Sequence, residues 1–364
     1  MKQKEMNFSK LIISSSVLFC ISLTIKIVST NTEFIEKYYS TLVYIKISVI
    51  LRALTGWIPF SMGDVLYLIA IIYCLVKLAQ WTTSAFQRKI TISTVLLNLI
   101  KIIRTGLIIY IVFNLFWGLN YNRSGISYQL QIKPTAYSTE ALKSLTVDLI
   151  KRVNSAYSTS NSYAFEREPY RTVFANAIAT YKNSSYHYLF PVYSNPSIKS
   201  ALINNFDNYF GIAGYYNPFT AEAQINTSIP RFLIPFITSH EIAHQLGYAN
   251  ESEANFIAYL VSKDSYENMF RYSTYFMLFN YANKQLLLRD SLSANTNFKV
   301  LDSLVKIDEA TYRNFLGDDR GFSTHHSTAF YNYYLKLNNP SKEMNAYDDV
   351  VALLIAYQKR YGEL

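Results

Sequence analysis

The segment HEIAH, residues 240–244, carries two histidines and a glutamate at the spacing of a metal site. On a helix, His240 and His244 lie one turn apart on the same face, so both imidazoles reach one zinc ion. Glu241 stands beside the first histidine, where it is placed to take a proton from a water molecule that the zinc activates. The spacing therefore predicts a helical zinc site with hydrolytic chemistry.

A catalytic zinc site takes three protein ligands and keeps one position for water, so a third ligand is needed. Gly247 favours the end of the first helix, and a second helix is expected to begin at Glu251. Glu251 and Asn255 share one face of that helix, which suits a carboxylate ligand and a polar partner for a histidine. Glu253 is the alternative ligand, because the connection between the two helices is short.

The opposing interpretation is an ordinary amphipathic helix whose histidines lie on the protein surface. The apolar side chains of Ile237, Ala243 and Leu246 border the histidine face, which predicts that this face is buried. Unpaired histidines and a glutamate are costly in a helical core unless a partner satisfies them. We therefore expect metal binding, whereas catalysis needs further support because a metal site can persist without turnover.

The composition of the chain that positions these residues indicates a membrane protein. Only 16% of the 364 residues are charged, against about 25% in a typical soluble domain, which argues against a disordered chain. Two cysteines exclude a disulfide-rich scaffold. Residues 1–120 hold 12 Lys/Arg against 4 Asp/Glu, whereas residues 121–364 hold 22 against 21. The polar part therefore lacks the basic excess that a nucleic-acid surface requires, and no nucleic-acid partner is expected.

Three apolar runs predict transmembrane helices at 11–28, 65–81 and 102–119. Each run has about 17–18 residues, near the lower limit for crossing the hydrocarbon core. Each also carries one Lys or Arg near an end, and such a long side chain reaches the headgroups at modest cost. The alternative, three buried core helices, needs a large partner to cover them.

Residues 41–60 form a fourth apolar stretch, with polar side chains at steps of three and four. On a helix these side chains make one polar stripe: Thr41, Tyr44, Ser48, Arg52 and Thr55. The pattern predicts an interfacial, amphipathic helix that lies on the membrane or against the other helices. A fourth crossing is the alternative, and it would move the carboxy-terminal part to the other side of the membrane.

Positive charge in the short flanks predicts the orientation of the chain. The amino terminus carries three lysines, and the linker 82–101 holds three cations and no acidic residue. Because cytoplasmic flanks are enriched in Lys and Arg, we expect both segments in the cytoplasm. No small-residue cleavage site follows the first run, which predicts an uncleaved anchor. The expected domains are a cell-membrane anchor, residues 1–120, and an extracytoplasmic domain on the periplasmic side, residues 121–364.

The second domain is expected to be mostly helical. A helix is predicted to start after Ser138-Thr139, followed by short helices and loops over 155–235. The short run AQINT, residues 223–227, predicts a strand. Amphipathic spacing predicts further helices at 237–247, 251–263, 267–290, 326–337 and 346–361. The fold class is therefore mainly α, with N-terminal transmembrane helices, a mostly helical domain and a small β element.

The core segment 237–260 resembles the zinc metallopeptidases of the HExxH-plus-glutamate type, the gluzincins. In that group the third ligand opens an ExxA-D/N motif, and here Glu251-Ser252-Glu253-Ala254-Asn255 has that form. The resemblance implies a zincin-like domain with Glu251 as the third ligand.

Over nearly its whole length the chain resembles the bacterial membrane-anchored proteins known as domain of unknown function 3810. The match is most specific in the core, GYYNPFTAEAQINTSIPRFLIPFITSHEIAHQLGYANESEANFIAYL, and weaker in WIPFSMGDVLY, FWGLNYNRSG, YNYYLKLN and YDDVVALLIAY. The family implies a zinc metallopeptidase domain outside the cytoplasmic membrane and supplies no substrate.

Related metallopeptidases pair an extended peptide with an edge strand that precedes the HExxH helix, which implies this role for AQINT, with a plain loop as the alternative. They also use a Tyr, His or Arg to stabilise the oxyanion. The candidates for that role are His325, His326, Tyr331 and Tyr334. A surface loop is the alternative for the histidine pair, and His187 is expected to be structural.

Together these expectations describe a membrane-anchored, zinc-dependent metallopeptidase that hydrolyses a peptide or protein substrate. His240, His244 and Glu251 hold Zn²⁺, Glu241 activates water, and the lipid bilayer surrounds the anchor. The alternative is a non-catalytic zinc-containing envelope protein that binds a peptide or protein partner. A transporter is disfavoured, because three short spans without a central charge make a poor pore.

Overall fold

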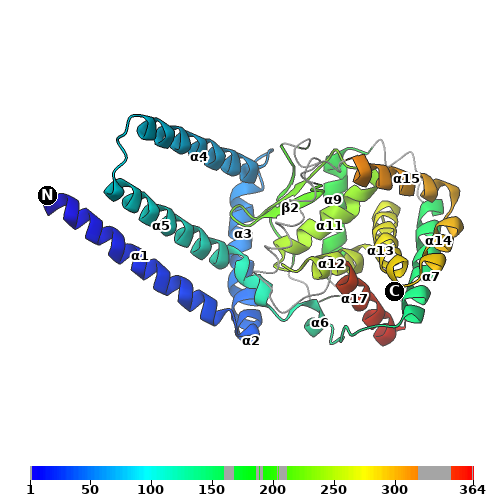
Figure 1. Ribbon diagram of the computed structural model, residues 1–364. Coiled ribbons are helices and arrows are strands. Elements are labelled where there is room, and N and C mark those ends of the chain that lie inside the picture. Colours follow the sequence, from blue (N-terminus) through cyan, green and yellow to red (C-terminus); the bar gives the residue numbers. More distant parts are fainter. Residues whose placement is uncertain are drawn as a thin grey trace.

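The protein is mainly helical with one small sheet, as the sequence predicts. The computed structural model describes residues 2–159, 168–185, 188, 192–202, 204, 211–318, 346–362 and 364. Within these residues, three long apolar helices form one arm of the molecule, and the remaining helices pack around the sheet on the other side (Figure 1).

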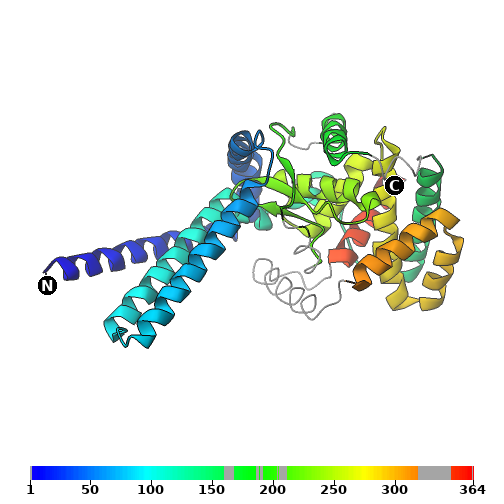
Figure 2. The ribbon, with the colours of Figure 1, turned by 90° about the horizontal axis from the view of Figure 1, so that it is seen from above.

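The apolar arm consists of α1 (Lys2–Val28), α4 (Met62–Phe86) and α5 (Ile92–Phe116). All three helices are long and apolar enough to cross a membrane, and they leave the same side of the molecule (Figure 2). All three are longer than the predicted apolar runs, because the helices include polar residues beyond the runs. Ser61 accepts a hydrogen bond from the backbone of Asp64, and Thr91 accepts one from Thr94.

A short helical segment crosses the base of this arm, between it and the rest of the protein (Figure 1). It comprises α2 (Thr32–Phe34), the π-helix η1 (Ile35–Val43) and α3 (Tyr44–Thr55). The chain therefore returns through α4 and α5 before it enters the second part through η2 (Gly118–Asn122) and α6 (Gly125–Gln129). We call residues 32–60 the base segment.

The second part is a helical domain around one apolar core, in which the long pair of α7 and α13 packs side by side. Its helices are α7 (Thr139–Thr159), α9 (Tyr170–Ser184), η3 (Arg231–Leu233), α11 (Ile234–Gln245), α12 (Glu251–Ser262), α13 (Asn268–Arg289), α14 (Ser291–Val300), α15 (Ser303–Asp318) and α17 (Ala346–Tyr361). The amphipathic spacing located most of these elements to within a few residues. The helix predicted at 326–337 lies outside the described residues.

The sheet contains β1 (Ile198–Ser200), β2 (Gly214–Asn217) and β3 (Glu222–Ile225), in the order β1-β3-β2. β3 pairs in parallel with β1 and antiparallel with β2. The strand predicted at AQINT therefore exists, but its expected place at the edge of the sheet is wrong. All four residues of β3 are buried between its two neighbours, and the edge nearer the histidine helix is β2.

Polar contacts lock the start of α4 to the sheet. The carboxylate of Glu222 accepts hydrogen bonds from the backbone of Met62 (3.1 Å) and Gly63 (2.6 Å). A carboxylate at a helix N-terminus satisfies free N–H groups and complements the helix dipole. Asp64 accepts a further bond from the backbone of Leu202 at 2.8 Å. The apolar arm is thus joined to the helical domain through buried polar groups.

Candidate metal centre

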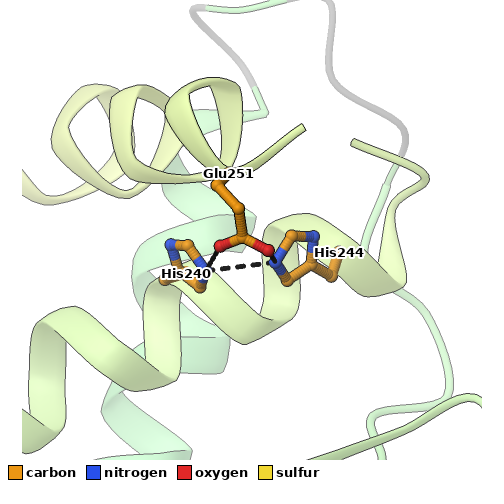
Figure 3. A group of neighbouring side chains, drawn as sticks. All are labelled: His240, His244 and Glu251. Carbon is orange, nitrogen blue, oxygen red and sulfur yellow. Dashed lines mark hydrogen bonds and ion pairs between the residues drawn. The ribbon is translucent and has the colours of Figure 1, made fainter. Parts of the chain in front are cut away.

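Three side chains converge between α11 and α12 (Figure 3). The Nε2 atoms of His240 and His244 lie 3.1 Å apart. The Glu251 carboxylate spans them, with one oxygen 3.2 Å from His240 and the other 3.6 Å from His244. All three ligand atoms lie within 4.8 Å of one another, so one ion can contact all of them.

Hydrogen bonds on the far side of each ring orient both imidazoles. Nδ1 of His240 lies 2.8 Å from Oδ1 of Asn255, and Nδ1 of His244 lies 2.7 Å from the carbonyl oxygen of Tyr248. Because both partners are oxygen acceptors, each Nδ1 must carry the proton. In the neutral tautomer the lone pair then sits on Nε2 and points at the centre. This arrangement is the one that metal-ligating histidines adopt.

The charges of the centre also suit a cation. Burial works to lower the pKa of His244, but the Glu251 carboxylate outweighs it and raises that pKa to about 9. Burial raises the pKa of Glu251, whereas the two imidazoles hold it well below its ordinary value. Without a metal, a proton on His244 therefore balances the Glu251 carboxylate, and a bound ion would replace it.

Glu241 lies in the same helix, with its carboxylate buried beside the centre. Burial raises its pKa to about 7, although the two imidazoles oppose this effect. Its Oε2 atom has no hydrogen-bond partner in the part of the chain that the structure describes. A buried carboxylate with an unused oxygen and a pKa near neutrality is what a general base requires.

Strand β2 passes directly over this carboxylate. A Cβ added at Gly214 would lie 2.9 Å from Oε1 of Glu241 and 2.9 Å from Cγ2 of Ile237. A side chain at this position would therefore force the glutamate, Ile237 or β2 to shift. Sequence spacing does not predict this contact, since the turn after β2, strand β3 and helix η3 lie between Gly214 and the helix that carries Glu241.

Glu253, the alternative ligand, points elsewhere. Its Oε1 accepts a hydrogen bond from the backbone of Ile126 at 3.2 Å, and the backbone of Gly125 packs against the same carboxylate. Asn250 caps α12, which fixes the start of the helix so that Glu251 occupies its first turn. The structure thus brings Glu251, and not Glu253, to the histidines.

Gly247 makes the turn between the two helices. Its φ of +88° lies in the left-handed region, where glycine is favoured, and the backbone of Tyr248 donates to the carbonyl of Ala243 at 3.1 Å. This cap turns the chain sharply and sends α12 back along α11. The carbonyl of Tyr248 is thereby placed against His244.

The residues proposed for oxyanion stabilisation, His325, His326, Tyr331 and Tyr334, lie outside the described residues, as does His187. The sequence reasoning missed one neighbour of the centre, Trp117, at the end of the apolar arm. Its Nε1 donates to the carbonyl of His244 at 3.2 Å, and its ring meets the His244 ring edge-on at 6.1 Å.

The chain matches a known protein family. A family model described as "Protein of unknown function (DUF3810)" matches residues 39–355, which confirms the resemblance seen in the sequence. The matched span includes all three converging side chains and the base segment from residue 39 onward. No curated protein and no solved structure matches the chain significantly.

Proposed function

Because the chain belongs to the DUF3810 family of proteins of unknown function, we propose its function from the centre itself: a membrane-anchored, zinc-dependent metallopeptidase. The observation that carries this proposal is the pair of hydrogen bonds at Nδ1 of the two histidines. The Tyr248 carbonyl holds the proton of His244 on Nδ1, and Asn255 does the same for His240. Both Nε2 lone pairs then face the Glu251 carboxylate, whose oxygens lie 3.2 and 3.6 Å from them, close enough for one ion to contact all three side chains.

The donor set fits a catalytic zinc site. Two imidazoles and one carboxylate are the ligands of several catalytic zinc sites, which keep a fourth position for water. Glu251 retains 25% of its side-chain exposure, whereas the histidines are nearly enclosed. Solvent therefore reaches the centre on the side of this carboxylate.

Bound there, a zinc ion would act as a Lewis acid toward water and a peptide carbonyl. Glu241 then accepts the proton of the attacking water at its unused Oε2 and delivers it to the leaving amine. Asn255 and the Tyr248 carbonyl keep the imidazoles aligned during this transfer. Because Gly214 has no side chain, β2 passes over the Glu241 carboxylate without displacing it.

The three apolar helices support the anchoring part of the proposal. With three crossings, the amino terminus and the α4–α5 connection lie on one side, and the metal centre lies on the other. Lys and Arg residues in the amino terminus and in the α4–α5 connection favour a cytoplasmic location for both segments. The metal centre then lies on the extracytoplasmic side of the cell membrane. The substrate is then a peptide or protein outside the cytoplasm.

The test is hydrolysis by the full chain in lipid nanodiscs with casein or a peptide library. Glu241→Gln should keep zinc and lose cleavage by a factor of at least about 100, because only the proton acceptor is removed. Glu253→Gln is the matched control and should cleave as the wild type does. A wild type that holds zinc and cleaves nothing would contradict catalysis and favour a non-catalytic zinc protein of the envelope.

A further inference from the structure

The last carbonyl groups of the histidine helix α11 receive hydrogen bonds from side chains of the membrane-associated segments. The hydroxyl of Tyr44 lies 2.9 Å from the carbonyl oxygen of Gln245 and 3.3 Å from that of His244. Nη1 of Arg52 donates to the Gln245 carbonyl at 3.1 Å. Nε1 of Trp117, at the end of α5, donates to the His244 carbonyl.

These carbonyls are the ones a helix leaves without partners. The last four C=O groups of an α-helix have no intrahelical donor and must find one elsewhere. In α11 the carbonyls of Ile242 and Ala243 accept from the following turn. The His244 carbonyl accepts from the backbone of Gly247 at 3.0 Å and also from side chains, whereas the Gln245 carbonyl accepts from side chains. These side-chain donors come from residues about 130 to 200 positions earlier in the chain. The last turn of α11 carries the ligand His244 itself.

Arg52 is deeply buried where the base segment meets the end of α11. Only 1% of the residue is exposed, and it forms no salt bridge among the residues that the structure describes. Its guanidinium is held by the carbonyls of Gln245 and Ser194, by the hydroxyl of Ser48, and by the Tyr193 ring. A buried cation without a carboxylate needs such partners, and the negative end of a helix dipole is one of them.

The opposite side of the base segment is apolar and exposed. Its exposed side chains include Leu42, Ile50, Leu54, Trp57 and Phe60. The base segment connects α1 to α4 in the chain. Both helices are long and apolar enough to span a membrane, and both leave the same side of the molecule (Figure 2). Because the base segment is continuous with both of these helices, we expect the bilayer surface to cover its apolar side. The polar side, with Tyr44 and Arg52, faces the helical domain.

We propose that Tyr44, Arg52 and Trp117 are positioning residues for the metal centre. They hold the last turn of α11, and with it the imidazole of His244, from segments that are seated on and in the membrane. The metal centre is therefore built jointly by the helical domain and the anchor. This inference rests on the proposed metal function, because it concerns the affinity of that centre.

A purely structural role makes a different prediction. If these contacts only stabilised the fold, their loss would lower the melting temperature of the metal-free protein and leave the dissociation constant for Zn²⁺ unchanged. If they position His244, the dissociation constant itself must rise. The two quantities are measured separately on the same variants.

The experiment uses the full chain in lipid nanodiscs, with Zn²⁺ titrated against a chelator. Tyr44→Phe removes the hydroxyl donor and keeps the ring, and Trp117→Phe removes the indole N–H donor and keeps a smaller aromatic ring. Each should weaken Zn²⁺ binding about fivefold, the effect of one net hydrogen bond. Arg52→Gln should weaken it further, and Arg52→Lys should restore part of the loss. Tyr38→Phe, on the exposed side of the same segment, is the control and should bind as the wild type does.

Unchanged Zn²⁺ affinity in both Tyr44→Phe and Trp117→Phe would overturn the inference, whatever happens to their melting temperatures. If Arg52→Gln does not fold, these two conservative variants still decide the question. A wild type that binds no Zn²⁺ would instead contradict the proposed function, so the two failures are distinguishable.

Discussion

Nδ1 of His240 lies 2.8 Å from Oδ1 of Asn255, which stands one turn after Glu251 on the facing helix. One helix face thus supplies both a proposed metal ligand and the group that orients another proposed ligand. Removing such an orienting partner typically weakens metal binding 10–100-fold. Asn255→Ala should therefore raise the Zn²⁺ dissociation constant by about that factor, measured by chelator competition.

Asn255→Asp keeps an oxygen acceptor and should recover most of the affinity. Asn283 is buried as deeply, but it bonds to Ala294 and Asn297, away from the centre. Asn283→Ala should lower stability without changing Zn²⁺ affinity. Equal Zn²⁺ affinity of the wild type and Asn255→Ala would show that the contact does not orient His240.

The close approach of Gly214 to Glu241 predicts a defect in turnover rather than in metal content. A methyl group at Gly214 would force the Glu241 carboxylate or β2 to shift by several tenths of an ångström. Such misplacement of a reacting group typically costs about tenfold or more in rate. Gly214→Ala should therefore keep zinc and lower kcat by about tenfold in a peptide-hydrolysis assay.

Gly106→Ala is the matched control, because nothing lies within 4 Å of a Cβ at that position in α5. It should cleave at the wild-type rate. If Gly214→Ala also cleaves at the wild-type rate, β2 does not confine the Glu241 carboxylate.

The Glu36–Arg123 pair predicts a pH-dependent contribution to stability. Burial works to raise the pKa of Glu36, but the hydrogen bond and charge of Arg123, 2.8 Å away, hold it below its ordinary value. The stabilisation is therefore fully present above the ordinary pKa and is lost as the pH falls through the lower value in the folded state. Glu36→Gln should lower the free energy of unfolding by about 3 kcal/mol at pH 7, because Arg123 then stays buried without its counterion.

Denaturant unfolding of both proteins at several pH values checks this prediction. The difference between wild type and Glu36→Gln should shrink as the pH falls below the ordinary pKa of 4.5 and through the lower pKa of Glu36 in the folded state, since Glu36 then becomes neutral in the wild type. A difference that is constant from pH 7 to pH 3 would mean that the charge of Glu36 does not stabilise the fold.

The orientation in the membrane is open to a direct test. Alkaline phosphatase, which is active only outside the cytoplasm, should be active when fused after Leu364 and inactive when fused after Arg88. The cations Arg88 and Lys89 lie in the short connection between α4 and α5, which favours the cytoplasm for that connection. The reverse pattern of activity would place the metal centre in the cytoplasm.

Local spacing explains why the grouping of His240, His244 and Glu251 was predictable. Residues one turn apart on a helix share a face, and a glycine turn brings the next helix back alongside, so the two histidines and a nearby glutamate were expected to meet. The short connection left Glu253 as the alternative, and the resemblance to the gluzincins favoured Glu251. The long apolar runs were predictable for the same reason, since composition alone indicates a membrane span.

Long-range contacts explain what the sequence did not predict. The polar stripe of the base segment was visible, but nothing in its spacing shows that Tyr44 and Arg52 meet Gln245, some 200 residues later. The central position of β3 in the sheet was also not predictable, because the sequence of a four-residue strand does not show how many strands pair with it. Such contacts depend on how distant elements pack, which spacing within one element does not encode.

The zinc content of the purified full chain tests the central claim most directly. After equilibrium dialysis against Zn²⁺, mass spectrometry should find one zinc per chain in the wild type and in Glu253→Gln. The Glu253 carboxylate of the wild type accepts a hydrogen bond from Ile126 and does not face the histidines. Glu251→Gln should lose most of the metal, because it lacks the carboxylate that spans both Nε2 atoms. A wild type without stoichiometric zinc, or a Glu251→Gln protein that retains it while Glu253→Gln does not, would contradict the account.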